Sequence, residues 1–236
     1  MAFCDSDDFV ELDMYEKLYN AANGKDIVFC DINIIENDSY QYTYKSNGEY
    51  YVEKEPFIKN FITSKWTPIY NCLINKNLIT KYNIGLPEHI RYCEDFYFMI
   101  KTIYYAKDIE KINQPLYNYS QENDNSIMHN LSSYSGNDDM RCYLEIIDFF
   151  SQNYCVERYQ KEISWRVLNA FHFDMFNPKK HKEILSVYPI CHRYILSNPF
   201  YINRQKQLMW LLTHHCRWLV LFFLYVRKLI GRKDIV

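Results

Sequence analysis

The sequence predicts an α/β domain followed by a mostly helical region. A strand, a helix and a second strand follow one another within the first 35 residues, which is the alternation typical of α/β proteins. From about Ser132 onward the apolar residues recur with a helical period instead. With 236 residues and 48% hydrophobic content, the chain is large enough to bury a sizeable core.

The first elements follow from apolar runs and from the residues that end them. Residues 1–4 are apolar and predict a buried strand that ends at an acidic cluster. Asp13 and Glu16 have the spacing of a capping box, which predicts the start of a helix that Gly24 ends. Residues 26–35 form a nearly continuous apolar run, as buried strands do.

Alternation and helical spacing define the elements that follow. Residues 39–53 alternate around turn residues at 46–48 and predict an exposed hairpin. Glu94 and Asp95 open a helix whose apolar face has a period of 3.6 residues. The other elements expected in this part are a helix over 57–62, an extended segment over 66–70, a helix over 75–82, and strands over 109–112 and 116–119.

The second region is expected to contain four helices, over 138–153, 156–172, 180–195 and 203–230. We place a domain boundary near residue 130, because the helical pattern starts just after it. The predicted domains are therefore 1–130 and 131–236.

The C-terminal segment is basic, whereas the rest of the chain is acidic. From Tyr201 onward seven Lys and Arg residues stand against one acid, which leaves +6 there and −8 over residues 1–200. Arg217 interrupts the apolar helix over 203–230 and would cost about 2.5 to 3.5 kcal/mol at the centre of a bilayer. We therefore expect peripheral membrane contact through 203–233, with a buried C-terminal helix that has a basic solvent face as the alternative.

The cysteines and the absence of a leader predict a cytoplasmic protein, with the basic segment at the inner face of the cell membrane. The eight cysteines form no C-x-x-C pair, which favours reduced thiols over a zinc site or a disulfide framework. No secretory signal opens the sequence. We expect no nucleic-acid partner.

Two acidic motifs are candidates for chemistry. Asp5 and Asp7 form a D-x-D at a predicted strand end, where alternate side chains point the same way and could hold one Mg²⁺ or Mn²⁺ with a diphosphate. Glu94 and Asp95 stand at a helix N-terminus, where the dipole should keep a carboxylate ionised. Acidic turns and ordinary helix capping explain either motif taken alone.

An ordered set of motifs resembles a known family. The set comprises residues 3–9 (FCDSDDF), 13–19 (DMYEKLY), 26–31 (DIVFCD), Trp66 with Ile69 and Tyr70, Leu73 with Ile74, Gly85 with Pro87 and Glu88, 93–98 (CEDFYF), and 116–119 (LYNY) before Asn125, Ser126 and Ile127. Over about residues 2–128 this is similar to the second half of a bacterial family-2 glycosyltransferase of the GT-A fold. Such enzymes build capsular, exopolysaccharide or lipopolysaccharide chains.

The resemblance implies a fold, a reaction and residue roles. It implies the C-terminal half of a GT-A mixed sheet, and inverting transfer from a nucleotide-diphospho-sugar, with Mg²⁺ or Mn²⁺, to a glycan or lipid-linked acceptor. Asp7 would be the direct metal ligand, with Asp5 nearer the ribose or a metal-bound water, and both would bind the donor. Asp95 would be the general base, supported by Glu94, and Trp66 would stack on the acceptor sugar, although core packing accounts for Trp66 equally well.

The chain also departs from the family pattern. The family's first half, which holds the base and ribose of the donor, has no counterpart here, so the resemblance implies an N-terminally truncated domain. We expect it to be an active transferase if the missing half is supplied and inactive as written otherwise. Relatives usually carry a basic residue between Tyr119 and Ser126, where this chain has Ser120, Gln121 and Glu122. This departure weakens the expected phosphate contact.

Two alternatives come from other functional classes. An inert remnant or membrane-associated interaction module would also explain the missing half, because strand 1–4 would then be an unpaired edge. A haloacid-dehalogenase-like phosphatase with Asp5 as nucleophile would share the apolar strand and the D-x-D. That family, however, places Thr or Val shortly after the second Asp, where Asp8 and Phe9 stand here.

Overall fold

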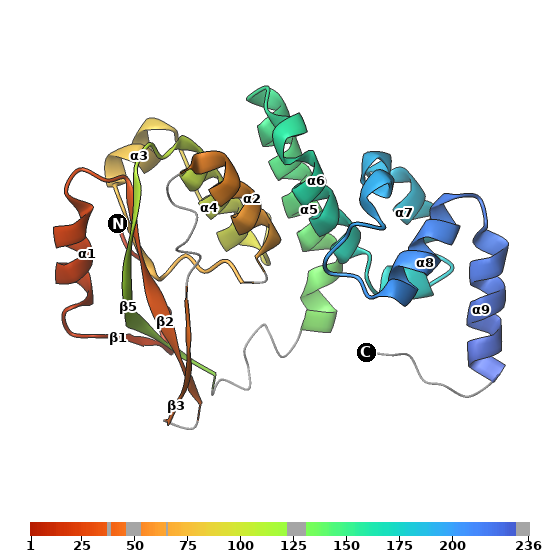
Figure 1. Ribbon diagram of the computed structural model, residues 1–236, viewed down its shortest axis with the longest axis horizontal. Helices are drawn as coiled ribbons and strands as arrows, with labels where there is room; N and C mark the ends of the chain where they lie inside the picture. The colour runs from red at the N-terminus through yellow and green to blue at the C-terminus, as the bar shows by residue number, and fades with distance from the viewer. Residues whose placement is uncertain (37–38, 46–52, 65, 122–130, 230–236) are drawn as a thin grey trace. The chain divides into compact units, whose positions relative to one another are not determined.

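The computed structural model describes residues 1–36, 39–45, 53–64, 66–121 and 131–229. The chain divides into two compact units, Met1–Cys142 and Tyr143–Val236. The first contains the β-sheet with its helices, and the second is helical (Figure 1). This mixed architecture confirms the predicted α/β fold class with a helical C-terminal region.

Strand β2 is the centre of the sheet in the first unit. It pairs in parallel with β5 along one edge, and its other edge pairs antiparallel with β4 and then with β3. The short β1 pairs antiparallel with β5. The described strands are β1 (Phe9–Val10), β2 (Ile27–Glu36), β3 (Ser39–Tyr44), β4 (Cys72–Ile74) and β5 (Ile109–Ser120). The largely apolar sequence of β2 suits its burial, since helices cover both faces of the sheet.

Helix α1 (Met14–Ala22) covers one face of the sheet, and α2 (Lys54–Thr63) and α4 (Glu94–Tyr105) cover the other (Figure 1). The short α3 (Lys76–Lys81) begins at Asn75, whose side chain accepts a hydrogen bond from the backbone N–H of Asn77. Between sheet and helices the core is rich in aromatic rings. Phe57 meets Phe29 edge to face at 6.1 Å, and Phe61 stacks on Phe96 at 6.0 Å.

One ion pair is buried in the sheet. The Nζ atom of Lys111 on β5 lies 2.8 Å from Oδ1 of Asp31 on β2, and the two side chains are only 7% and 6% exposed. Asp31 lies opposite Pro115, where the register between β2 and β5 shifts. The bulge and the ion pair therefore occur at the same point of the sheet.

Most helices of the first unit were predicted correctly, but one cap was not. The expected helices over 57–62 and 75–82 are confirmed as α2 and α3, and α4 begins at Glu94 as expected. The capping box at the start of α1 is wrong, because the Asp13 side chain makes no capping hydrogen bond and pairs with Lys17 at 2.8 Å instead. Gly24, just after α1, has a φ of +85°, which suits a residue without Cβ.

The strands differ more from the prediction. The expected strand over 1–4 is not formed: Met1 exchanges two backbone hydrogen bonds with Ile74, and Phe3 packs against Phe98 of α4 at 5.6 Å. The two strands expected over 109–112 and 116–119 form the single strand β5.

The expected hairpin and extended segment also change. Part of the expected hairpin is present as β3, which pairs with β2, while the turn expected at 46–48 lies outside the described residues. Residues 66–70 form no strand, and β4, which follows them, was not predicted.

The helices that follow α5 (Leu131–Gln152) are shorter than expected, whereas α5 begins earlier than the predicted helix over 138–153. In order, the helical elements are α5, which begins in the first unit, α6 (Val156–Ala170), the 3₁₀ turn η3 (Asp174–Phe176), α7 (His181–Ser186), the 3₁₀ segment η4 (Pro189–Tyr194), α8 (Asn203–Thr213) and α9 (Arg217–Leu229). The helix predicted over 180–195 is broken because Pro189 lacks the N–H that a continuing helix needs. The single helix predicted over 203–230 is broken at 214–216, where His215 has a φ of +63°.

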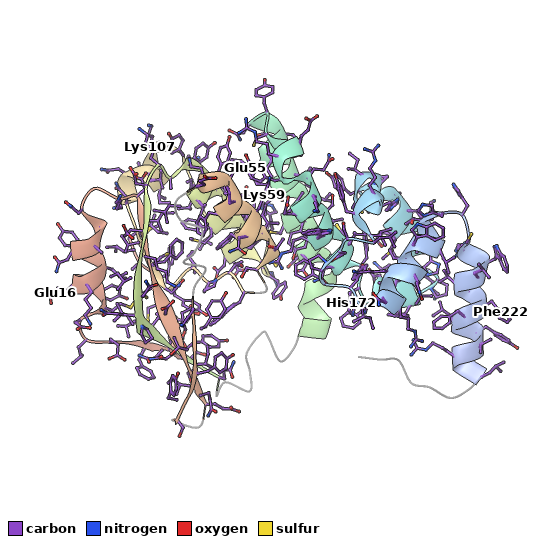
Figure 2. The ribbon with its side chains drawn as sticks, viewed as in Figure 1. Glu16, Glu55, Lys59, Lys107, His172 and Phe222 are labelled. Atoms are coloured by element: carbon purple, nitrogen blue, oxygen red, sulfur yellow. The ribbon has the colours of Figure 1, made fainter. Side chains whose placement is uncertain are left out.

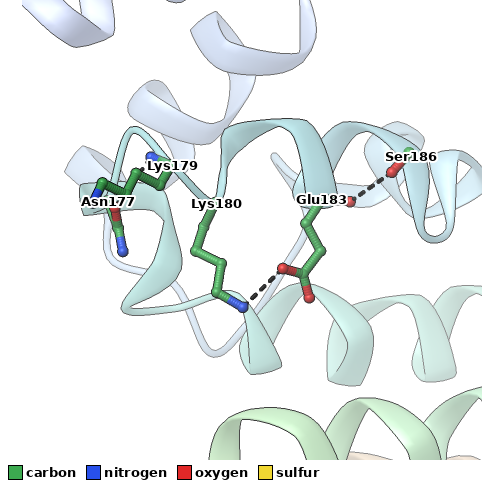
Figure 3. A network of polar contacts seen from close by, with 5 residues as sticks. All are labelled: Asn177, Lys179, Lys180, Glu183 and Ser186. Atoms are coloured by element: carbon green, nitrogen blue, oxygen red, sulfur yellow. Dashed lines mark hydrogen bonds and ion pairs between the residues drawn. The ribbon is translucent and has the colours of Figure 1, made fainter.

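Local polar contacts organise the start of α7 (Figure 3). Oδ1 of Asn177 accepts from the backbone N–H of Lys179, and the Nζ atom of Lys180 pairs with Glu183 at 2.8 Å. The hydroxyl of Ser186 donates to the backbone carbonyl of Glu183. A similar pair, Glu55 with Lys59, lies on the outer side of α2 (Figure 2). None of the helices in the described ranges is long and apolar enough to cross a membrane.

Candidate functional site

The acidic segment Asp5–Asp8 is held by strand β5. Tyr117 donates its hydroxyl to Oδ2 of Asp8 at 2.6 Å and accepts the backbone N–H of Asp5 at 3.1 Å. The backbone N–H of Ser120 donates to Oδ1 of Asp8 at 2.8 Å. Both oxygens of Asp8 are thus engaged within the protein, which leaves Asp5 and Asp7 as the exposed carboxylates of the segment.

The D-x-D is a turn and not an extended strand end. Ser6 and Asp7 occupy the turn, which the backbone N–H of Asp8 closes by donating to the carbonyl of Asp5 at 3.3 Å. The expectation that Asp5 and Asp7 alternate on extended backbone is therefore wrong. A turn held at both ends still presents the two carboxylates on one short segment.

Desolvation dominates the electrostatics of this segment. The surrounding protein raises the pKa of Asp5, and the neighbouring charge of Asp7 raises it further. Burial also raises the pKa of Asp8, although the hydrogen bonds from Tyr117 and Ser120 act in the opposite direction. Crowded, partly desolvated carboxylates of this kind favour a bound cation.

Asp95 is the most perturbed carboxyl group of the site. Burial, followed by the charges of Glu94 and Asp5, raises the pKa of Asp95 to about 7. The pKa of Glu94 is raised as well, chiefly by burial. We expected the helix dipole to keep these acids ionised, but at the start of α4 burial outweighs it. Phe3, two residues before Asp5, packs against Phe98, three residues after Asp95, so the two acidic motifs lie on segments that are in contact.

Residues 138–142 in the middle of α5 hold the loop that leads to Glu94. Four hydrogen bonds join the two segments. Asp138 and Asp139 accept through their carboxylates, from the backbone N–H of Arg91 at 3.2 Å and from Sγ of Cys93 at 3.2 Å. Arg141 and Cys142 donate to backbone carbonyls, Nη1 to that of His89 at 2.8 Å and Sγ to that of Cys93 at 3.3 Å. Cys93 has a left-handed φ of +68°. These contacts fix the backbone immediately before the acidic pair.

Trp66 belongs to an aromatic cluster beside the acidic segment. Its ring is half-buried and lies 4.8 Å from that of Tyr44 and 5.2 Å from that of Tyr119, both edge to face. Tyr70 stacks on Tyr117 at 4.3 Å and so connects this cluster to the residue that holds Asp8. Trp66 is therefore both packed and partly accessible.

No role was predicted for Tyr70, Tyr117 and Tyr119, although they link Trp66 to the acidic segment. The pKa values of Tyr70 and Tyr117 lie above the ordinary value, chiefly because of burial, so both hydroxyls stay protonated. The alternation of Tyr117 and Tyr119 along β5 was the available signal, since residues two apart on a strand share a face.

The carboxylates suit a cation that a ligand also coordinates. Within the described residues, no group of three or more Cys, His, Asp or Glu side chains is arranged to hold a metal ion. Mg²⁺, however, is usually held by one or two carboxylates together with substrate phosphates. Asp5 and Asp7 are two exposed carboxylates, separated by one residue, and so match this requirement in number and type.

The chain has a distant sequence relative among curated proteins. No protein-family model matches the chain. Over 169 residues the chain is 24% identical to a protein of Bacillus subtilis (strain 168) named "Putative glycosyltransferase EpsH", a match that covers 69% of this chain and 49% of that protein. The chain thus spans about half the length of the curated relative that it matches.

Solved structures of TarS from S. aureus are similar to this chain. TarS 1–349 in complex with UDP-GlcNAc matches with a TM-score of 0.58 and 16% identity, over 100% of this chain and 70% of that one. Its complex with UDP matches with a TM-score of 0.55 and 15% identity, over 100% and 69%. The chain therefore has a glycosyltransferase-like fold and a weak sequence similarity to a protein named as a glycosyltransferase.

Proposed function

We propose that this chain is a family-2 glycosyltransferase of the inverting, metal-dependent type. It would transfer a sugar from a nucleotide-diphospho-sugar to a hydroxyl group of a glycan or lipid-linked acceptor, in the synthesis of a surface polysaccharide. The observation that carries the proposal is the packing of the D-x-D segment against α4 through Phe3 and Phe98, next to Asp95, whose pKa of about 7 suits a base that works near neutral pH. The UDP-GlcNAc complex of TarS supports a nucleotide-sugar as the donor.

Asp95 would accept the proton of the attacking hydroxyl. The acceptor oxygen forms a bond to the anomeric carbon from the face opposite the diphosphate, and the bond between that carbon and the diphosphate oxygen breaks. The electron pair leaves with the diphosphate, so the anomeric configuration inverts. Glu94 would support Asp95, because its negative charge helps to keep the base's affinity for a proton high.

Asp5 and Asp7 would hold a divalent cation, Mg²⁺ or Mn²⁺, together with the diphosphate. Such a cation offsets the negative charge that develops on the departing diphosphate. Tyr117 would keep the turn in place through its contacts with Asp5 and Asp8. Trp66 would offer the accessible part of its ring to the acceptor sugar.

The test separates donor binding from chemistry. With Mn²⁺ and UDP-sugars, the Asp95→Asn variant should bind the donor as the unchanged chain does in calorimetry, but release of UDP should fall by about 10²- to 10⁴-fold, as expected for loss of a general base. Asp7→Ala should weaken donor binding and make it insensitive to Mn²⁺. Glu16→Gln, a change on the outer side of α1 (Figure 2), is the matched control and should alter neither quantity.

Two results would contradict the proposal. Undiminished turnover in Asp95→Asn would exclude this residue as the base. No saturable binding of any nucleotide-sugar by the chain would favour an inert remnant or an interaction module instead of an enzyme.

A further inference from the structure

Helix α9 exposes an apolar stripe. Trp218, Phe222, Tyr225 and Leu229 recur at intervals of three or four residues, which places them on one face of the helix. All four side chains are between 60% and 68% exposed. Phe222 extends from α9 away from α8 (Figure 2).

The opposite face of α9 is fixed by cations. Arg227 is buried and lies over the rings of Phe176 and Phe223, at 5.6 Å and 6.0 Å. Arg204 of α8 lies over the same Phe223 ring at 4.8 Å. Rotation of α9 about its axis would break these cation–π contacts, so they define which face of α9 turns outward.

The first residue of α9 is fixed as well. Arg217 donates through Nε to Nδ1 of His181 at 3.4 Å and through Nη2 to the carbonyl of Pro178 at 3.2 Å. The helix is therefore held at both ends with its apolar face outward. Among the described residues of α9, the exposed ones include two cations, Arg217 and Lys228, beside the apolar stripe.

The charge around the stripe indicates what covers it. The sequence contains no Asp or Glu between Glu183 and Asp234, whereas Arg and Lys recur throughout this segment. Lys228, next to the stripe, is exposed. An apolar face that includes Trp and Tyr, within an acid-free and basic segment, has the composition of helices that lie in the surface of anionic membranes.

A second protein molecule fits the stripe less well. Stable protein interfaces involve about 20 to 30 residues on each side, while the stripe consists of four side chains on one helix of 13 residues. A helix of this length is also well short of the roughly 20 residues that a span needs. We propose that α9 binds a bilayer that contains anionic lipid by inserting Trp218, Phe222, Tyr225 and Leu229 between the headgroups.

Vesicle flotation tests the proposal with the whole chain. The chain should bind vesicles of phosphatidylcholine and phosphatidylglycerol about tenfold more tightly than vesicles of phosphatidylcholine alone, and added salt should weaken the binding. The variant Phe222→Ser/Tyr225→Ser should lose at least tenfold in affinity for the mixed vesicles. Tyr40→Ser/Tyr42→Ser, which removes two exposed rings from β3, is the matched control and should bind as the unchanged chain does.

Fluorescence quenching shows whether α9 itself is inserted. Lipids brominated near the headgroup should quench tryptophan emission of the bound chain, and Trp218→Phe should remove most of that quenching while the protein still binds. Quenching that is unchanged in Trp218→Phe, or equal binding by Phe222→Ser/Tyr225→Ser and the control, would overturn the proposal. A dimer in light scattering that Phe222→Ser/Tyr225→Ser converts to a monomer would instead assign the stripe to a second copy of the chain.

Discussion

Each unit contains a marked departure from the usual distribution of polar and apolar groups, and the two departures differ in kind. The first unit buries ionisable side chains: Asp31 and Lys111 form a buried ion pair, and Asp95 is desolvated at the candidate site. The second unit turns rings outward, with Trp218 and Phe222 exposed on α9. Neither buried charged groups nor exposed aromatic rings stabilise the folded state in general. Where they occur, they therefore indicate residues that serve a function other than folding. In the first unit we infer chemistry, and in the second contact with an apolar phase.

The largest expected effect concerns the buried pair. Asp31→Ala should lower the free energy of unfolding by about 3 to 5 kcal/mol, because it leaves the buried charge of Lys111 without the carboxylate that offsets it. Urea unfolding followed by circular dichroism measures this change. Replacement of both partners, as Asp31→Leu/Lys111→Met, should recover most of the loss.

The exposed pair of the second unit is the matched control. Lys180 and Glu183 lie at the same distance of 2.8 Å but are 36% and 39% exposed. Glu183→Ala should therefore change the free energy of unfolding by less than about 1 kcal/mol. An Asp31→Ala variant that is no less stable than Glu183→Ala would contradict the view that the first unit depends on buried charge.

The next effect is a pH dependence at Asp95. Its pKa is raised from the ordinary 3.8 to about 7, so between these values the native state keeps a proton that the unfolded chain has released. The contribution of this group to stability therefore falls as the pH rises from 4 to 7, and the deficit stays constant above 7. Asp95→Asn cannot ionise and should be more stable than the unchanged chain at pH 8, by on the order of 1 to 3 kcal/mol.

Thermal unfolding at pH 4 and pH 8 checks this prediction. The gain from Asp95→Asn should nearly vanish at pH 4, where the carboxyl group is neutral in the native protein. A gain of the same size at both values would show that the substitution acts through packing and not through charge.

The smallest effect concerns the buried cation of the second unit. Arg227→Ala should lower the free energy of unfolding by about 1 to 2 kcal/mol, since it removes a guanidinium from two aromatic faces together with its packed aliphatic part. Lys228→Ala, an exposed neighbour, should have almost no effect in the same urea titration. Equal stabilities of the two variants would mean that Arg227 does not fix the orientation of α9.

Local features were predictable, whereas pairing was not. The helix that begins at Glu94 follows from an apolar period of 3.6 residues, and the acidic motifs are contiguous in the sequence. The contact of Tyr117 with Asp8 joins residues 109 positions apart, and no local pattern encodes it. The continuous strand β5 was missed for a similar reason, because its pairing with β2 carries the chain across Pro115.

Some errors could have been avoided. Pro189 inside a predicted helix is a known breaker, and the polar residues at 213–217 marked the division between α8 and α9. The outward face of α9 could not be predicted, since apolar residues surround the helix between Trp218 and Val226. The burial of Arg227 under aromatic rings, which only the fold reveals, selects that face.

The left-handed backbone at Cys93 limits how this position can vary during evolution. A β-branched residue there would add about 1 to 2 kcal/mol of strain directly before Glu94 and Asp95, whereas Gly or Asn would relieve it. Gly would also remove the thiol that donates to Asp139. Descendants of this sequence should therefore accept few residues at position 93, and changes at Asp139 should accompany those that they accept.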